Sequence, residues 1–175
     1  VAVRACEVLD AKQELVLFIC RSPVLASFIK ERLKSTRVQV LNFDNLQYRI
    51  KKGDTPKFTA LVVDEGQDML DMDSIEELDN LFDGGLADGR WYFFMDQNNQ
   101  GSLYAEVDAS ALDYLKESST KIPLTRNCRN TRQIAGHTLM YTGGDIGNCL
   151  ISADGLPVLW KDQFYGDKAT LVQLI

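Results

Sequence analysis

The 175-residue chain lacks the features that mark several large classes of protein. Its four cysteines (Cys6, Cys20, Cys128 and Cys149) lie far apart and form no C-x-x-C pair, so the usual spacing of a zinc site is absent. No segment approaches the roughly 18 uninterrupted apolar residues of a membrane span. The first residues also lack the basic start and apolar run of a secretory signal. These absences favour a cytoplasmic protein with reduced thiols and no membrane partner.

An excess of positive charge is also missing. Lys and Arg number 19 against 25 Asp and Glu, which gives a net charge of −6. A protein that coats nucleic acid needs clustered cations to neutralise phosphates, so this balance argues against that class. It does not exclude a local surface that binds DNA. Much of the acidity is concentrated between Asp64 and Asp83.

Apolar segments alternate with segments of helical periodicity along most of the chain. The pattern predicts a helix over residues 1–11 and further helices after Ser22-Pro23, Asp73-Ser74, Asp108 and Thr131. Short strands are expected at the following apolar runs: residues 15–20, 38–41, 61–63, 91–95 and 122–124. Strands separated by helices indicate an α/β fold with a parallel, doubly wound sheet flanked by helices. We expect one domain over 1–142, and a glycine-punctuated linker with the beginning of a second domain over 143–175.

Two of the expected strands end in acidic residues. Asp64 and Glu65 follow the apolar run at 61–63, and Asp96 follows the aromatic run at 91–95. Ligands of open α/β sheets bind beyond the carboxyl ends of the strands. A carboxylate there can hold Mg²⁺, and a neighbouring one can orient water for attack on a phosphoryl group. Alternatively, the two residues simply begin a loop or cap a helix.

The complete strings around these carboxylates resemble motifs of the UvrD/Rep-type superfamily 1 DNA helicases. Residues 60–68 read A-L-V-V-D-E-G-Q-D, similar to motif II, V-D-E-A-Q-D, with Gly66 in place of alanine. Residues 91–104 resemble motif III, commonly G-D-x-x-Q. A methionine replaces its glycine, and either Asn99 or Gln100 stands for its glutamine.

Two further segments resemble motifs of the same family, in the expected order. Residues 124–131 read L-T-R-N-C-R-N-T, similar to motif IV, L-x-x-N-Y-R-S/N-T, with Cys128 where tyrosine is usual. Residues 15–33 are similar to motif Ia, a strand followed by a helix beside single-stranded DNA. Arg21 and Ser22 stand there where the family often has an aromatic residue and an asparagine.

The resemblance implies a RecA-like sheet of the P-loop NTPase class, with ATP and Mg²⁺ as cofactors and single-stranded DNA as partner. It implies that Asp64 holds Mg²⁺ through water and that Glu65 is the catalytic base. It also implies that Gln67 couples nucleotide state to DNA and that Gln100 senses the γ-phosphate. Arg129 is implied to contact that phosphate and stabilise charge in the transition state.

The phosphate-binding string G-x-x-x-x-G-K-[ST] is absent from the 175 residues. We therefore interpret the chain as a fragment of an ATP-dependent helicase or translocase that partners the remainder of the helicase chain. The polypeptide alone is expected to be a poor or inactive ATPase. The alternative is a non-catalytic DNA- or partner-binding module derived from a helicase.

Overall fold

A computed structural model describes residues 1–96, 108–144, 146–151 and 155 of the chain. It divides into two compact units, residues 1–122 and residues 123–175. The division therefore falls between Ile122 and Pro123, whereas the glycine content of the sequence places a boundary at residue 142.

The first unit is a mixed α/β structure built on a four-stranded parallel sheet. The strand order is β2-β1-β3-β4, so β1 and β3 are central and β2 and β4 are edges. The strands have the following bounds: β1 Val16–Cys20, β2 Val38–Asn42, β3 Ala60–Val63 and β4 Arg90–Phe93. All residues of β1 and β3 are buried, because helices cover both faces of the sheet.

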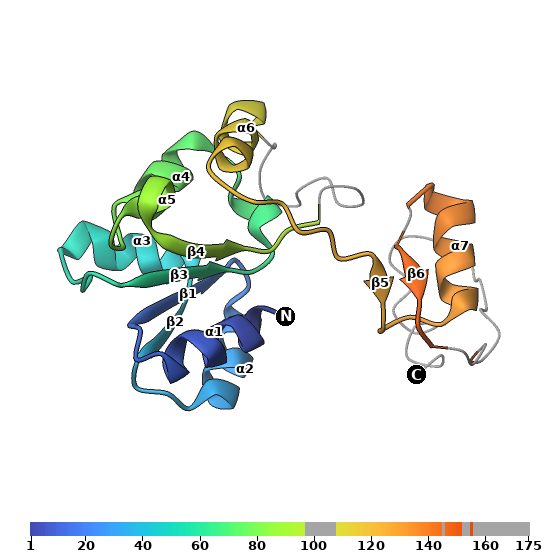
Figure 1. Ribbon diagram of the computed structural model, residues 1–175, viewed down its shortest axis with the longest axis horizontal. Coiled ribbons are helices and arrows are strands. Elements are labelled where there is room, and N and C mark those ends of the chain that lie inside the picture. Colours follow the sequence, from blue (N-terminus) through green and yellow to red (C-terminus); the bar gives the residue numbers. More distant parts are fainter. Residues whose placement is uncertain (97–107, 145, 152–154, 156–175) are drawn as a thin grey trace, which may run out of the picture. The chain divides into compact units, whose positions relative to one another are not determined.

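Helices flank the sheet on both sides (Figure 1). Two of them pack with one face of the sheet: α1 Ala2–Ala11 and α2 Pro23–Leu33. The helices on the other face are α3 Phe43–Lys52, α4 Met72–Asp79, α5 Gly85–Asp88 and α6 Ala109–Glu117. A short 3-10 helix, η1 Gly66–Met69, follows β3.

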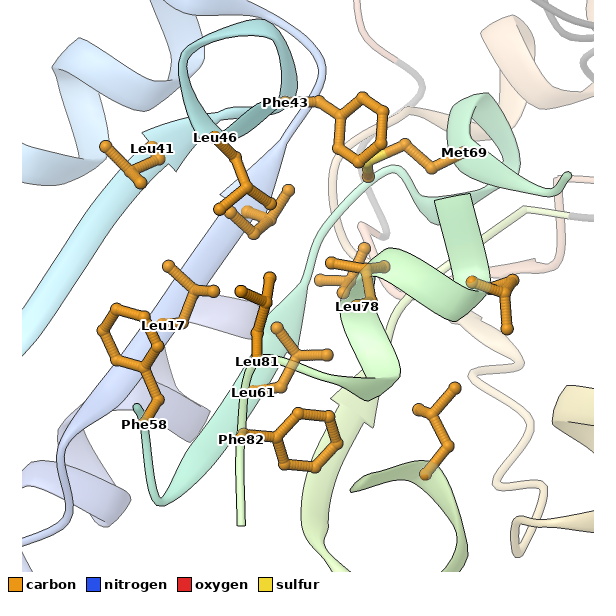
Figure 2. Close-up of a cluster of buried hydrophobic side chains, with 14 of the residues drawn as sticks. Leu17, Leu41, Phe43, Leu46, Phe58, Leu61, Met69, Leu78, Leu81 and Phe82 are labelled. Carbon is orange, nitrogen blue, oxygen red and sulfur yellow. The ribbon is translucent and has the colours of Figure 1, made fainter. Parts of the chain in front are cut away.

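The two faces of the sheet carry separate apolar cores, because alternate strand residues point to opposite sides. The face toward α3 to α6 buries the larger set, which includes Leu17 of β1, Leu61 of β3 and Leu46 of α3. Figure 2 shows Phe58 and Phe82 at one end of this cluster and Phe43 and Met69 at the other. The apolar cluster on the face toward α1 and α2 has fewer residues and includes both buried cysteines, Cys6 and Cys20.

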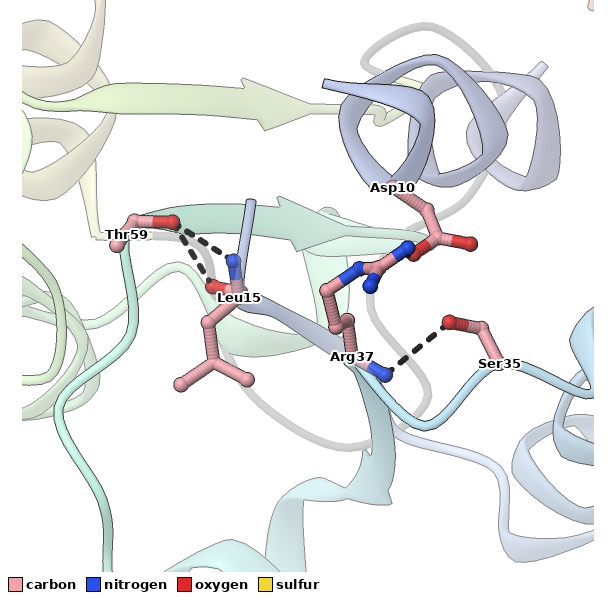
Figure 3. Close-up of polar contacts among 5 residues, drawn as sticks. All are labelled: Asp10, Leu15, Ser35, Arg37 and Thr59. Carbon is pink, nitrogen blue, oxygen red and sulfur yellow. Dashed lines mark hydrogen bonds and ion pairs between the residues drawn. The ribbon is translucent and has the colours of Figure 1, made fainter. Parts of the chain in front are cut away.

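Polar contacts fix the amino ends of the strands (Figure 3). The Thr59 hydroxyl accepts a hydrogen bond from Leu15 N at 2.8 Å and donates one to Leu15 O at 3.4 Å. Arg37 Nε lies 3.0 Å from Asp10 Oδ1, and Arg37 N donates to Ser35 Oγ at 3.1 Å. These contacts link the segments that enter the strands at their amino ends. Asp64 and Glu65 lie at the opposite side of the sheet, where the strands have their carboxyl ends.

The second unit holds a helix, α7 Arg132–Thr142, and a two-stranded parallel sheet. Its strands, β5 Arg126–Asn127 and β6 Asn148–Cys149, are two residues long. Thr131 caps α7, as the sequence predicts, by accepting a hydrogen bond from Ile134 N at 3.4 Å. No described residue of α7 is buried.

Several elements differ from the prediction. Residues 122–124 form no strand, because Pro123 lacks the N–H that a ladder requires and the segment is exposed; β5 lies further along. Helix α3 was not predicted. Helix α4 begins after Asp71, whose carboxylate accepts a hydrogen bond from Ser74 N at 2.8 Å. It ends at Asp79, so Gly84 and Gly85 do not close it.

The expected strand at 156–160 and the helix after residue 169 lie outside the described residues. Within the described part of the chain, no helix has the length and apolarity needed to cross a bilayer.

Candidate functional site

The acidic pair lies at the carboxyl end of the buried central strand β3, as the sequence predicts. Val63 pairs with Ile19 of β1, and Asp64 extends the ladder by donating its backbone N–H to Ile19 O at 2.9 Å. Because β1 and β3 are fully buried, the backbone that carries Asp64 is held on both sides. A carboxylate on such a strand end has a rigid support.

A hollow of about 530 Å³ opens beside Asp64 on the side of α1 and α2. Both apolar and charged side chains of α1 and α2 line it. It is lined by Val1, Val3, Arg4, Glu7, Leu25, Phe28, Ile29, Arg32 and Asp64. Arg4 Nη1 lies 2.9 Å from Glu7 Oε2, so Arg4 already has an acidic partner within α1. Among the described residues, Arg32 forms no ion pair.

Burial raises the pKa of the Asp64 carboxyl, and the neighbouring Glu65 carboxylate raises it further. The same environment acts on the thiols of the α1 and α2 side. Burial first, and the Asp64 charge second, raise the pKa of Cys6 and of Cys20 to about 12. A cation beside Asp64 is therefore favoured, because it offsets the cost of keeping this carboxylate charged.

Glu65 has a left-handed backbone, with φ 54° and ψ 44°, which side-chain-bearing residues rarely adopt. This conformation turns the chain sharply at the end of β3. The buried Gln67 then holds the exposed Glu65 in place, because Gln67 Nε2 donates to Glu65 Oε2 at 2.7 Å. Gln67 Oε1 accepts a hydrogen bond from Asp96 N at 3.2 Å. One amide side chain thus joins the ends of β3 and β4.

Gly66 meets the end of β4 directly. Its N–H donates to Phe94 O at 2.8 Å, and a Cβ at this position would lie 2.0 Å from Phe93 Cε1. Glycine at position 66 therefore has a physical reason in this chain, because the Phe93 ring occupies the space that a side chain would need. Sequence reasoning noted the glycine and missed its partner in β4.

Asp64 and Glu65 are too few to enclose a metal ion with protein ligands alone. Within the described residues, no three His, Cys, Asp or Glu side chains gather around one point. Magnesium in phosphate-handling sites keeps several waters and is held by one or two carboxylates together with the substrate phosphates. The donor set of Asp64 with Glu65 nearby fits that pattern.

Arg21 and Ser22, expected at a DNA contact, follow β1 at the same edge of the sheet. Arg21 Nη2 lies 3.6 Å from Asp44 Oδ1, and its guanidinium stacks 5.7 Å from the centre of the Phe43 ring. Ser22 Oγ accepts a hydrogen bond from Leu25 N at 3.2 Å and caps α2. Both side chains therefore have structural partners within the unit.

Arg129 belongs to the second unit. It is exposed on the bend after β5, and its N–H donates to Asn127 Oδ1 at 3.0 Å. The same Asn127 oxygen accepts from Asn130 N at 3.0 Å, and Asn127 Nδ2 donates to Ile146 O at 3.0 Å. The backbone of this bend is thus fixed by one asparagine. Gln100, and the competing Asn99, lie outside the described residues.

Comparison of the chain with protein-family models, with curated proteins and with solved structures gives no match.

Proposed function

We propose that residues 1–122 form the magnesium-binding part of a RecA-like ATPase domain from a UvrD/Rep-type DNA helicase or translocase. The observation that carries the proposal is the arrangement at the end of β3. A half-buried Asp64 with a raised pKa stands beside Glu65, and Gln67 holds the Glu65 carboxylate at 2.7 Å. These are the groups that a metal-assisted attack of water on a phosphate requires.

In this proposal Asp64 holds Mg²⁺ through a water molecule and Glu65 accepts a proton from the attacking water. Gln67 orients Glu65, and because Gln67 also bonds Asp96 N, a shift of the segment after β4 would move the Glu65 carboxylate. The hollow beside Asp64 receives the phosphates, with Arg4 and Arg32 supplying positive charge at its rim.

Residues beyond this site complete the proposed activity. Arg129 supplies a positive charge to the γ-phosphate, and Gln100 senses that phosphate. Single-stranded DNA passes the carboxyl edge of the sheet near Arg21 and Ser22. These roles rest on the motif resemblance. Arg21 is paired with Asp44 and Ser22 caps α2, so both would have to exchange a structural contact for a contact with DNA.

Metal binding by the full chain tests the proposal. Free Mn²⁺, a paramagnetic substitute for Mg²⁺, is measured by electron paramagnetic resonance in the presence of wild type, Asp64→Asn and Asp113→Asn. Asp113 is an exposed carboxylate on α6 and serves as the matched control. We expect Asp64→Asn to weaken Mn²⁺ binding about ten-fold or more and Asp113→Asn to leave it unchanged. Equal binding by all three proteins contradicts the assignment.

The 175 residues contain no G-x-x-x-x-G-K-[ST] string, so few backbone N–H groups are aimed at the phosphates. We therefore expect the isolated chain to bind MgATP weakly and to turn it over slowly. Robust Mg²⁺-dependent hydrolysis by the purified chain would overturn that expectation.

The missing string also favours a second candidate, a non-catalytic module that kept the helicase fold for binding. The two candidates differ in their response to Glu65→Gln. If Glu65 acts as a base, this substitution sharply lowers whatever rate of ATP hydrolysis the chain retains. If the chain is a non-catalytic module, its binding of DNA or a partner does not change.

A further inference from the structure

One side of α3 presents polar side chains around a hollow in the first unit. Asn45, Tyr48, Arg49 and Lys52 are spaced i, i+3, i+4 and i+7, so they share one side of the helix. They line a hollow of about 390 Å³ together with Leu41 of β2 and Asp54 of the following loop. Tyr48 is 58% exposed, which is high for so large a side chain.

This face is positive in a chain whose net charge is −6. Arg49, Lys51 and Lys52 fill the last turn of α3, where the helix dipole favours cations. In the described ranges, none of these three forms an ion pair, although six other cations do. Lys52 Nζ instead lies 4.5 Å from the centre of the Tyr48 ring, which orients the ammonium group beside the hollow.

The hollow is separate from the acidic site. Helix α3 begins directly after the carboxyl end of β2 and leads back toward the amino end of β3. Its last turn therefore stands near the edge of the sheet opposite Asp64. The inference rests on different residues from the proposed function and stands or falls independently of it.

We propose that this face of α3 binds a short acidic peptide segment of a partner protein. Arg49 and Lys52 pair with acidic side chains of the peptide, Asp54 and Asn45 accept its backbone N–H groups, and the exposed Tyr48 ring contacts an apolar side chain. A polyphosphate strand fits less well. Asp54 and Asn45 offer hydrogen-bond acceptors in the hollow, and a peptide backbone has N–H groups to donate to them, whereas the backbone of a phosphate polymer has none.

Fluorescence anisotropy of the full chain tests this. The probe is a fluorescein-labelled peptide of alternating Asp and Leu, with an Asn-Leu peptide of the same length and a labelled oligothymidine as comparisons. The variant Arg49→Gln/Lys52→Gln removes two cations from the hollow. The matched control, Lys12→Gln/Lys30→Gln, removes two cations, one directly after α1 and one within α2, that line neither hollow. Far-ultraviolet circular dichroism checks that both variants fold.

We expect the wild type to bind the Asp-Leu peptide in preference to the other two probes. Arg49→Gln/Lys52→Gln should weaken this binding about ten-fold, and Lys12→Gln/Lys30→Gln less than two-fold. Equal loss in both variants means that net charge alone acts, which overturns the proposal. Tighter binding of the oligothymidine, or no binding of the Asp-Leu peptide by the wild type, overturns it as well.

Discussion

The end of β3 and the bend that carries Arg129 are built in opposite ways. Glu65 has a strained left-handed backbone, and the segment after it is held by Phe94 O, by the Phe93 ring and by Asp96 N. At the bend, Asn127 fixes the backbone, and the Arg129 side chain is exposed without an ion pair among the described residues.

The two regions differ in how much of the surrounding structure orients the charged side chain. The carboxylates of the first unit are oriented by neighbours within their own unit, so their geometry is complete before any ligand binds. The Arg129 guanidinium has no ion pair among the described residues to orient it. Substitutions at the end of β3 should therefore change stability, and substitutions at Arg129 should change only binding.

The largest expected effect comes from adding one methyl group at Gly66, compared with the same change at a glycine of the second unit. Gly66→Ala puts a Cβ 2.0 Å from Phe93 Cε1 and should lower the free energy of unfolding by about 1–3 kcal/mol. The same substitution at Gly136 in α7 meets nothing within 4 Å and should raise helix stability by up to about 1 kcal/mol. Urea denaturation of each variant measures both changes.

A second substitution isolates the cause. Phe93→Leu removes the ring that occupies the space at Gly66, so Gly66→Ala should cost less in that background than in the wild type. Equal cost in the two backgrounds means that the ring does not set the residue type at position 66.

The next effect concerns the amide that joins β3 to β4. Gln67→Met keeps the side-chain length and leaves Asp96 N and the Glu65 carboxylate without this partner, at a cost of about 1–3 kcal/mol. Asn127→Ala, which removes three hydrogen bonds in the second unit, should leave the transition of the first unit unchanged. Thermal unfolding followed at Trp91 reports the first unit. A shift there upon Asn127→Ala would contradict the separation of the two regions.

A smaller effect, of opposite sign, is expected at Asp64. Its pKa is raised in the folded state, so between the ordinary and the raised pKa the folded protein holds a proton that the unfolded chain has lost. The free energy of unfolding therefore falls as pH rises through this window. Asp64→Asn removes that cost and should stabilise the protein by about 0.5 kcal/mol at neutral pH.

The gain from Asp64→Asn should vanish below the ordinary carboxyl pKa, where Asp64 is protonated in both states. Urea titrations at neutral and acidic pH measure it. A loss of stability at neutral pH would show that the Asp64 charge is favourable in the fold and that the site is not prepared for a cation.

The smallest effect is expected at Arg129. Because its side chain is exposed, Arg129→Gln should change the free energy of unfolding by less than about 0.5 kcal/mol. A larger loss in the same urea experiment would mean that the guanidinium has a structural partner, and the contrast with the end of β3 would disappear.

Much of the first unit could be predicted because its signals are local. The apolar runs of β1 and β3 and the caps at Ser22 and Asp108 lie within a few residues of the elements they specify. Helix α3 escaped prediction because Asn42 both ends β2 and caps the helix, so no polar segment separates the two.

The site was predictable in its residue types and unpredictable in its geometry. The position of Asp64 and Glu65 after an apolar run shows that they end a strand. The left-handed backbone of Glu65 has no signal of its own, because glycine usually marks that conformation. The fit of Gly66 to Phe93 depends on the β3–β4 pairing, which joins residues far apart in the sequence.

The central claim is that Asp64 is prepared for a magnesium ion, and the pKa of that one carboxyl tests it. Carbon-detected NMR of the aspartate carboxyls, with Asp64→Asn to assign the resonance, follows the titration with and without Mg²⁺. The account predicts a pKa above the ordinary aspartate value without metal and a clear decrease when Mg²⁺ is added. An Asp64 pKa that does not respond to Mg²⁺ would contradict it.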